Sequence, residues 1–132
     1  MLLRPATVCA AALLGACANP LGLETAPASL RTDELEAVKK AMAKDLRDPE
    51  SARFGPMNVA RDKKTGALMV CGWLNSKNAF GGYVGFTPYF ARLDQSYDRS
   101  FTLRFLRLSE NLDHSMVVSM HCSAPGLGMP PR

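Results

Sequence analysis

The stretch Ala67-Leu-Met-Val-Cys-Gly-Trp-Leu74 decides the fold of this chain. Successive side chains of a β-strand point to opposite faces of the sheet. Here both alternating sets are apolar, with Leu68, Val70 and Leu74 in one and Met69, Cys71 and Trp73 in the other. A strand that is apolar on both faces is covered on both sides. We therefore predict that residues 67–74 form a central strand.

Three further stretches predict strands around it, at residues 57–61, 83–92 and 101–108. The turn Asp62-Lys-Lys-Thr-Gly66 precedes the central strand, and its residues are typical of hairpins. A second turn is expected at 75–82. Pro88 cannot donate to a ladder, so its strand needs a bulge or an edge position there. The sequence thus predicts a small antiparallel sheet of about four to five strands.

Residues 33–47 predict an amphipathic helix. Its apolar positions are spaced three to four residues apart, as helices require: they are Leu35, Val38, Met42 and Leu46. Thr32 or Asp33 can cap its start. Asp48-Pro49 ends it and can begin a short turn over residues 50–54, with Phe54 entering the core. We expect an α+β fold in which this N-terminal helix packs on the sheet.

The C-terminal part is harder to assign. Residues 115–122 alternate in a way that favours a strand, although Leu112, Met116 and Met120 also stand at helical spacing. Both alternatives remain open, with the strand preferred. The tail 125–132 contains three prolines and two glycines, so we expect it to be disordered. The expected single domain is then residues 31–124.

Residues 1–16 have the parts of a bacterial signal peptide. Arg4 provides a positive start, and residues 6–14 form an apolar run that is shorter than the roughly 20 residues needed to span a bilayer. The motif Leu14-Gly-Ala-Cys17 resembles the bacterial lipobox. This resemblance implies cleavage before Cys17, lipid on its sulfur and acylation of its amino group. Residues 17–30 would then be a lipidated tether.

An alternative for the N-terminus is an ordinary secreted protein cleaved after Ala18, because Ala16-Cys17-Ala18 also fits the A-x-A pattern. Under the lipoprotein interpretation, Ala18 lacks the Asp that resembles an inner-membrane retention signal. We therefore expect an outer-membrane anchor facing the periplasm. Loss of residues 1–16 would lower the formal net charge from +4 to +3, which is too small to indicate nucleic-acid binding.

The cysteine count supports export. With Cys9 removed in the signal and Cys17 lipidated, Cys71 and Cys122 remain, and a pair in an oxidising compartment predicts a disulfide. It would close a loop of about 50 residues and contribute roughly 4 kcal/mol. A metal site from both cysteines with His114 and His121 is the alternative, but the spacing is not that of a zinc module. We expect no metal and no cofactor.

The segment Cys71-Gly-Trp-Leu-Asn-Ser-Lys-Asn-Ala-Phe-Gly-Gly-Tyr-Val-Gly-Phe86 is the most distinctive part of the chain. Together with Asp48-Pro-Glu-Ser-Ala-Arg-Phe54 it resembles a group of small exported bacterial proteins of unknown function, with the pattern DPxSAxF and CGxxNxKNxFGGYxGxxxF. The resemblance covers roughly residues 35–90 and Cys122. It implies membership of that group and no particular reaction.

The same segment contains a candidate recognition patch. It consists of Asn75, Lys77, Asn78 and Tyr83. The alternative is that these polar residues only satisfy their own turn, since asparagine readily bonds to nearby backbone. A phosphate loop is excluded because G-x-x-x-x-G-K is absent.

The catalytic motifs that we sought are absent from the sequence. There is no G-x-S-x-G elbow and no H-E-x-x-H. Asp113-His114-Ser115 are consecutive, so His114 cannot lie between the other two side chains as in a triad. We therefore expect a non-enzymatic envelope lipoprotein that binds an envelope protein or a cell-wall polymer. The alternative is a small periplasmic hydrolase whose site is assembled only by the fold.

Overall fold

An antiparallel five-stranded sheet forms the middle layer of the protein. The computed structural model describes residues 21–96, 100–107 and 112–132. The strands follow one another in the order β1-β2-β3-β4-β5; their bounds are Thr25–Pro27, Arg53–Asp62, Leu68–Asn75, Thr87–Gln95 and Phe101–Arg107. The apolar stretch lies in β3, with two strands on either side of it. The predicted central strand and the α+β class are confirmed.

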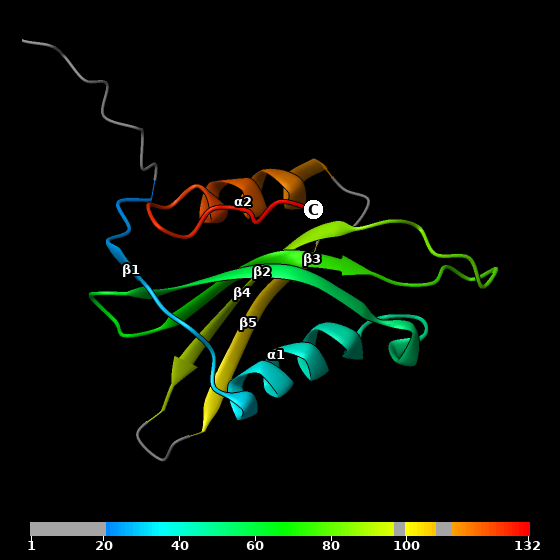
Figure 1. Cartoon of the computed structure of the whole chain (residues 1–132), viewed down its shortest axis with the longest axis horizontal. Helices are drawn as coiled ribbons and strands as arrows, with labels where there is room; N and C mark the ends of the chain where they lie inside the picture. Colours follow the sequence, from blue (N-terminus) through cyan, green and yellow to red (C-terminus); the bar gives the residue numbers. More distant parts are fainter. Residues whose placement is uncertain (1–20, 97–99, 108–111) are drawn as a thin grey trace, which may run out of the picture.

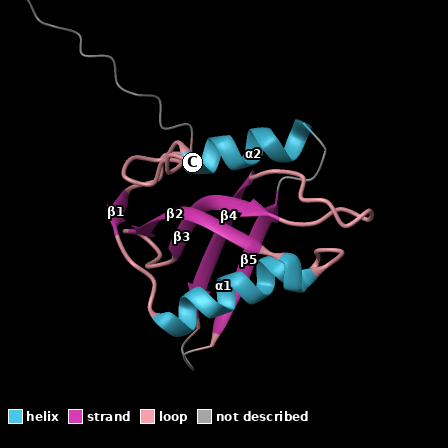
Figure 2. Ribbon diagram, turned by 45° about the vertical axis from the view of Figure 1, so that its right-hand side comes forward, coloured by secondary structure: helices cyan, strands magenta, loops and turns pink. Residues whose placement is uncertain are grey.

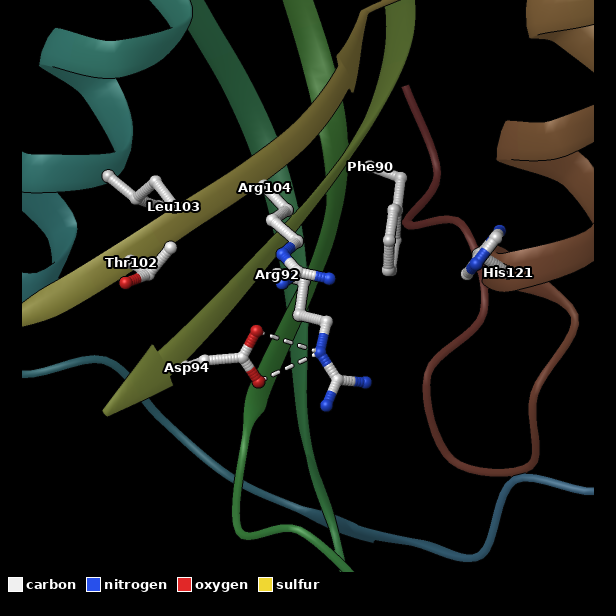
Figure 3. A pocket seen from close by; sticks show the side chains of 7 residues that line it. All are labelled: Phe90, Arg92, Asp94, Thr102, Leu103, Arg104 and His121. Atoms are coloured by element: carbon white, nitrogen blue, oxygen red, sulfur yellow. Dashed lines mark hydrogen bonds and ion pairs between the residues drawn. The ribbon is translucent and has the colours of Figure 1, made fainter. Parts of the chain in front are cut away.

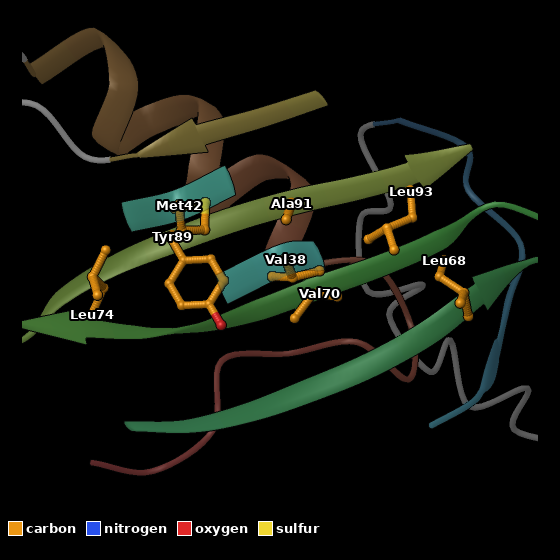
Figure 4. Close-up of a cluster of buried hydrophobic side chains, with 8 residues drawn as sticks. All are labelled: Val38, Met42, Leu68, Val70, Leu74, Tyr89, Ala91 and Leu93. Carbon is orange, nitrogen blue, oxygen red and sulfur yellow. The ribbon is translucent and has the colours of Figure 1, made fainter. Parts of the chain in front are cut away.

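Helix α1 (Thr32–Lys44) covers one face of the sheet (Figure 1). Val38 and Met42, from the predicted apolar stripe, are completely buried. They pack with side chains of β3 and β4 (Figure 4); this α1-side core contains Val38, Met42, Leu68, Val70, Leu74, Tyr89, Ala91 and Leu93. The helix begins one residue earlier than predicted and ends three residues earlier, at Lys44, so Asp48-Pro49 is not its end. Glu34 Oε2 accepts the Arg31 amide (2.8 Å), which satisfies a free N–H at the helix start.

Helix α2 (Leu112–Cys122) covers the opposite face (Figures 1 and 2). The preference for a strand at 115–122 was therefore wrong. The alternation that favoured it arises because this helix is apolar on several sides, which hides the helical period. Val118 and Cys122 are buried in a second apolar cluster, the α2-side core, whose other buried members are Ala60, Met69, Cys71, Phe90, Ala124 and Leu127. The predicted disulfide joins Cys122 to Cys71 of β3, and thus fixes the end of α2 to the central strand.

The C-terminal tail also covers this face, in contrast to the predicted disorder at 125–132. Leu127 is only 1% exposed. Trp73 Nε1 donates to Pro130 O (2.8 Å), and Asn58 Nδ2 donates to Gly128 O (3.1 Å). The guanidinium carbon of Arg132 lies 4.4 Å from the centre of the Trp73 ring. The tail is held because Trp73 and Asn58 offer polar groups to a backbone rich in prolines and glycines.

The domain also begins earlier than predicted. Residues 25–27, assigned to the tether, form β1 and pair with the end of β2, with Ala26 opposite Arg61. The Thr25 hydroxyl donates to Pro125 O, which links this edge to the C-terminal tail. Leu30 packs against the α1-side core. A tether can therefore include at most the residues before β1, and residues 1–20, with Cys17, lie outside the described chain.

The short turn predicted after Asp48-Pro49 is present, but β2 begins four residues before the predicted strand at 57–61 and includes residues 53 and 54 of the predicted turn. Pro49–Ser51 form the short helix η1, and Phe54 packs edge-on against Tyr89, with ring centroids 6.1 Å apart. β2 starts at Arg53 and contains an irregularity between Phe54 and Met57. Within the described residues Pro88 pairs only with Trp73 of β3, because the described β4–β5 ladder begins at Tyr89. It therefore has the predicted edge position.

Candidate functional site

The segment 76–86 projects from the end of the sheet between β3 and β4 (Figures 1 and 2). A bridge between Lys77 and Tyr83 joins its two arms. The Lys77 amide donates to Ser51 Oγ in η1 (3.0 Å), and the Ser51 hydroxyl donates to Asp48 O (2.7 Å). The loop is thus held against the turn that follows α1. The two parts of the sequence motif, at 48–54 and 71–86, meet at this point.

The two asparagines of the predicted patch stabilise the loop backbone. Asn78 Oδ1 accepts from the amides of Phe80 (2.9 Å) and Gly82 (3.1 Å). Asn75 Oδ1 accepts from the Gly85 amide (3.0 Å), at a residue whose φ of 98° favours glycine. Both side-chain oxygens therefore already have partners within the protein. Their geometry matches the alternative interpretation, in which these polar residues only bond to the backbone of their own turn.

The loop exposes large apolar side chains that the sheet cannot cover. Phe80 at its tip is 96% exposed and Val84 is 62% exposed. Phe86 and Tyr83 are also among the exposed large apolar residues. Hydrogen bonds hold the backbone of the loop while these side chains stay in solvent. Clustered exposed apolar groups of this kind mark binding surfaces more often than scattered ones do.

Two cations lie beside the ring of Tyr83. The guanidinium carbon of Arg53 is 4.1 Å from the ring centre, and Lys77 Nζ is 5.7 Å from it. Such contacts contribute about 0.5–1 kcal/mol each at exposed sites. They orient the ring and place positive charge next to the apolar tip. The loop therefore presents a surface that is both apolar and cationic.

Of the four predicted patch residues, the half-buried Lys77 lies beside the exposed Tyr83, whereas Asn75 and Asn78 bond to the backbone. Three further residues of this surface, Phe80, Val84 and Arg53, were not predicted from the sequence. A signal for Phe80 was present in the sequence. An aromatic residue between an asparagine turn and a glycine pair is too far from either strand to reach the core.

Apart from the 76–86 loop, a hollow lies on the α2 side of β4 and β5 (Figure 3). Its volume is about 850 Å³ and it is wide open to solvent. The residues around it come from β4, β5 and the end of α2; they are Phe90, Arg92, Asp94, Thr102, Leu103, Arg104 and His121. Three of these side chains carry or can carry positive charge, against one carboxylate. The polar groups of β4 are largely paired with one another.

Arg92 is the centre of this pairing. Its Nε donates to Asp94 Oδ1 (2.9 Å), and its Nη1 is 3.8 Å from Asp62 Oδ2. Asp62 is only 3% exposed. The Thr65 hydroxyl (2.7 Å) and the Lys64 amide (2.9 Å) donate to its carboxylate, and these bonds, more than Arg92, lower the pKa of Asp62. Arg92 and Asp62 thus fix the turn between β2 and β3.

His121, a candidate residue of the hydrolase alternative, contacts its own helix and Phe90. Its Nδ1 lies 2.9 Å from Val117 O, and its ring stacks on Phe90 with centroids 4.4 Å apart. Asp94 is engaged by Arg92 on its strand. In a Ser-His-Asp triad, the histidine is oriented by a carboxylate and lies within hydrogen-bond reach of the nucleophile. His121 has a backbone carbonyl as its partner instead, within its own helix.

The metal alternative required the thiolates of Cys71 and Cys122, and both sulfurs are in the disulfide. Within residues 21–96, 100–107 and 112–132, no cluster of three or more metal-ligating side chains occurs. None of the helices in the described part of the chain has the length and apolarity needed to cross a bilayer.

Comparisons with protein-family models, curated proteins and solved structures found no match to the chain.

Proposed function

We propose that this protein is a lipid-anchored envelope protein and acts as a non-enzymatic binding module through its 76–86 loop. One observation carries this proposal: Phe80 is 96% exposed at the tip of a loop whose backbone is held by Asn78 and by Ser51. The Phe80 ring gains nothing from folding because it stays in water, and a partner that covered it would gain about 25 cal/mol for each Å² of apolar surface buried. Rigid loops on a stable scaffold commonly carry binding function.

The N-terminal sequence and the disulfide support the proposed location of the protein in the cell envelope. The lipobox-like motif ends at Cys17, and the Cys71–Cys122 bridge suits an oxidising compartment. Two or three acyl chains on Cys17 would give stable attachment to a membrane. Ala18 favours the outer membrane, with the domain in the periplasm. The resemblance to small exported bacterial proteins supports the same address.

The direction of the loop supports a partner away from the anchoring membrane. In Figures 1 and 2, β1 lies at one end of the domain and the 76–86 loop lies at the other. A lipid on Cys17 would attach near the first of these ends. The loop would then point into the periplasm, towards an envelope protein or a cell-wall polymer. Arg53 and Lys77 beside Tyr83 suit an anionic partner.

Site-specific photo-crosslinking in intact cells tests the binding role. The full chain receives a photoreactive phenylalanine analogue at Phe80 or, as the control, at Lys63, an exposed residue of the β2–β3 turn. We expect a discrete adduct from position 80 that position 63 does not give. Lys77→Glu should reduce it, because the cation beside Tyr83 is then reversed. The proposal is wrong if position 80 yields no adduct, or the same adduct as position 63.

The anchor has a separate test. Cells that produce the full chain are grown with labelled palmitate, and the Cys17→Ser variant serves as the control. We expect label in the wild type only. Equal label in both proteins, or in neither, would remove the lipid anchor from the proposal without affecting the crosslinking result.

A further inference from the structure

The free edge of β5 is the second unusual surface of this protein. β5 is the last strand of the sheet, and within the described residues it pairs only with β4, from Gln95–Phe101 to Tyr89–Arg107. The opposite edge is formed by β1, which has only three residues and ends in Pro27. Short edge strands and prolines are common protections against unwanted strand pairing. β5 has seven residues and no proline, so it offers a full row of backbone groups.

Hollows lie along both faces of this edge. On the α2 side is the polar hollow around Arg92 and Arg104. On the α1 side is a groove of about 590 Å³ between α1, η1 and β5. It is lined mainly by alanines of α1 and by Leu103, with two lysines and one glutamate; its residues are Ala37, Lys40, Ala41, Ala43, Lys44, Pro49, Glu50 and Leu103. Leu103 borders both hollows, so they meet at β5.

Within the described residues, the unpaired cations beside the free edge of β5 favour an acidic segment as the added strand. Lys40 and Lys44 on the α1 side and Arg104 on the α2 side have no ion-pair partner in the described parts of the chain. Arg92, in contrast, is neutralised by Asp94 and Asp62. An added strand would place alternate side chains on the two faces. Acidic residues on the α2 side would meet Arg104, while apolar residues would enter the alanine-lined groove.

A second copy of this chain is a poor occupant. Antiparallel pairing of β5 with its own copy over all seven residues centres on Arg104, and so puts two Arg104 side chains opposite each other. Like charges directly opposite in a ladder destabilise it. The same arrangement would bring Lys40 and Lys44 of both copies to one side of the joined sheet. The cations thus disfavour self-pairing and favour an acidic partner.

We propose that β5 binds an extended acidic segment of a partner protein, which adds a strand to the sheet edge. Backbone hydrogen bonds to β5 would supply affinity, and the two flanking hollows would supply selectivity, as in other cases of strand addition. Glutamate or aspartate would alternate with small or branched apolar residues in this segment. The site is separate from the 76–86 loop, so each can fail without the other.

Fluorescence anisotropy with a defined peptide tests this inference. The probe is a labelled seven-residue peptide of alternating glutamate and valine, with blocked ends, and the control peptide has lysine in place of glutamate. The protein is the purified full chain in mild detergent. We expect saturable binding of the glutamate peptide only. Arg104→Glu should weaken it about tenfold, whereas Lys63→Glu, on the turn next to β1, should change it by less than about twofold.

Two N-methylated probes distinguish strand pairing from simple charge attraction. One is methylated at every valine amide and the other at every glutamate amide. In an edge strand the amides of alternate residues face the neighbour, so at least one of these peptides should lose binding. Undiminished binding of both N-methylated peptides, an unchanged affinity for Arg104→Glu, or a dimer of the protein in sedimentation that the glutamate peptide does not dissociate would overturn the proposal.

Discussion

Tyr89 carries the most unusual polar group of the core. Its side chain is completely buried among the apolar residues that face α1 (Figure 4). Its hydroxyl has no hydrogen-bond partner in the described parts of the chain. A buried hydroxyl without a partner loses its hydration and gains nothing in return. We therefore expect Tyr89→Phe to stabilise the protein.

The size of this effect follows from the cost of an unsatisfied buried group, about 1–3 kcal/mol. Removal of the hydroxyl keeps the ring and its edge-on contact with Phe54. It leaves only a small void where the oxygen was, which offsets part of the gain. We expect a net increase in the free energy of unfolding of about 1 kcal/mol. For a domain of this size that corresponds to roughly 4 °C in melting temperature.

Urea unfolding of wild type and Tyr89→Phe measures this difference. Tyr83→Phe is the matched control, because Tyr83 is 37% exposed whereas Tyr89 is fully buried; its change should stay within about 0.5 kcal/mol. The slope of the transition should be the same in all three proteins. If Tyr89→Phe destabilises the protein by 1 kcal/mol or more, the hydroxyl makes a stabilising bond and the argument is refuted.

The alkaline limb of the stability curve provides an independent check. Burial raises the pKa of Tyr89 to about 12 from 10. Above pH 10 the unfolded chain loses this proton while the folded protein keeps it, so stability falls as pH rises through 12. Two pKa units correspond to about 2.7 kcal/mol. The advantage of Tyr89→Phe over wild type should therefore grow between pH 10 and 12, and a constant difference would contradict the pKa shift.

Three further predictions concern the disulfide, Gly72 of β3 and Asp62 of β2. Replacing both Cys71 and Cys122 by serine should lower the free energy of unfolding by about 4 kcal/mol, since a bridge across 51 residues is lost; urea unfolding of the double variant measures it. Gly72→Ala should destabilise by about 1–3 kcal/mol, because its Cβ would lie 2.8 Å from Tyr89 Cζ. That penalty should persist in the Tyr89→Phe background, where Cζ is unchanged. Asp62→Asn should lower stability at pH 7 and flatten its dependence on pH, since the depressed pKa of Asp62 stabilises the fold above about pH 4 and this contribution is lost as pH falls; thermal unfolding from pH 2 to 7 tests it.

The parts of the fold that the sequence predicted correctly are those with a single strong period. The stripe through Val38 and Met42 has only one helical face, and the apolar run 67–74 is short and bounded by turn residues, which favours a strand over a helix. The pairing of Cys71 with Cys122 followed from counting. These signals are local, or depend on a residue type that has few possible partners. They were sufficient for the α+β class and for the disulfide.

The candidate sites were less predictable because they depend on neighbours that are distant in sequence. Arg53 reaches the Tyr83 ring only because β2 pairs with β3. Leu103 lines two hollows only because β5 is the last strand. Asn78 could be recognised as a turn residue, but its acceptance of two backbone amides depends on the path of the loop. Strand order is the information that the sequence lacks here.

The two incorrect predictions at the C-terminus, a strand at 115–122 and a disordered tail at 125–132, have a common physical cause. The apolar character of both faces of residues 67–74 already argued against them. A strand that is apolar on both faces needs two covers, and the helix at 33–47 supplies only one. The second cover must come from the remaining apolar segments, which lie after residue 111. A strand at 115–122 would have extended the sheet and left Met69 and Cys71 uncovered. The helix α2, with Leu127 beside it, buries both. The requirement that Cys71 be covered therefore outweighs the local alternation of 115–122, and it also explains why a tail rich in proline and glycine is held against the sheet.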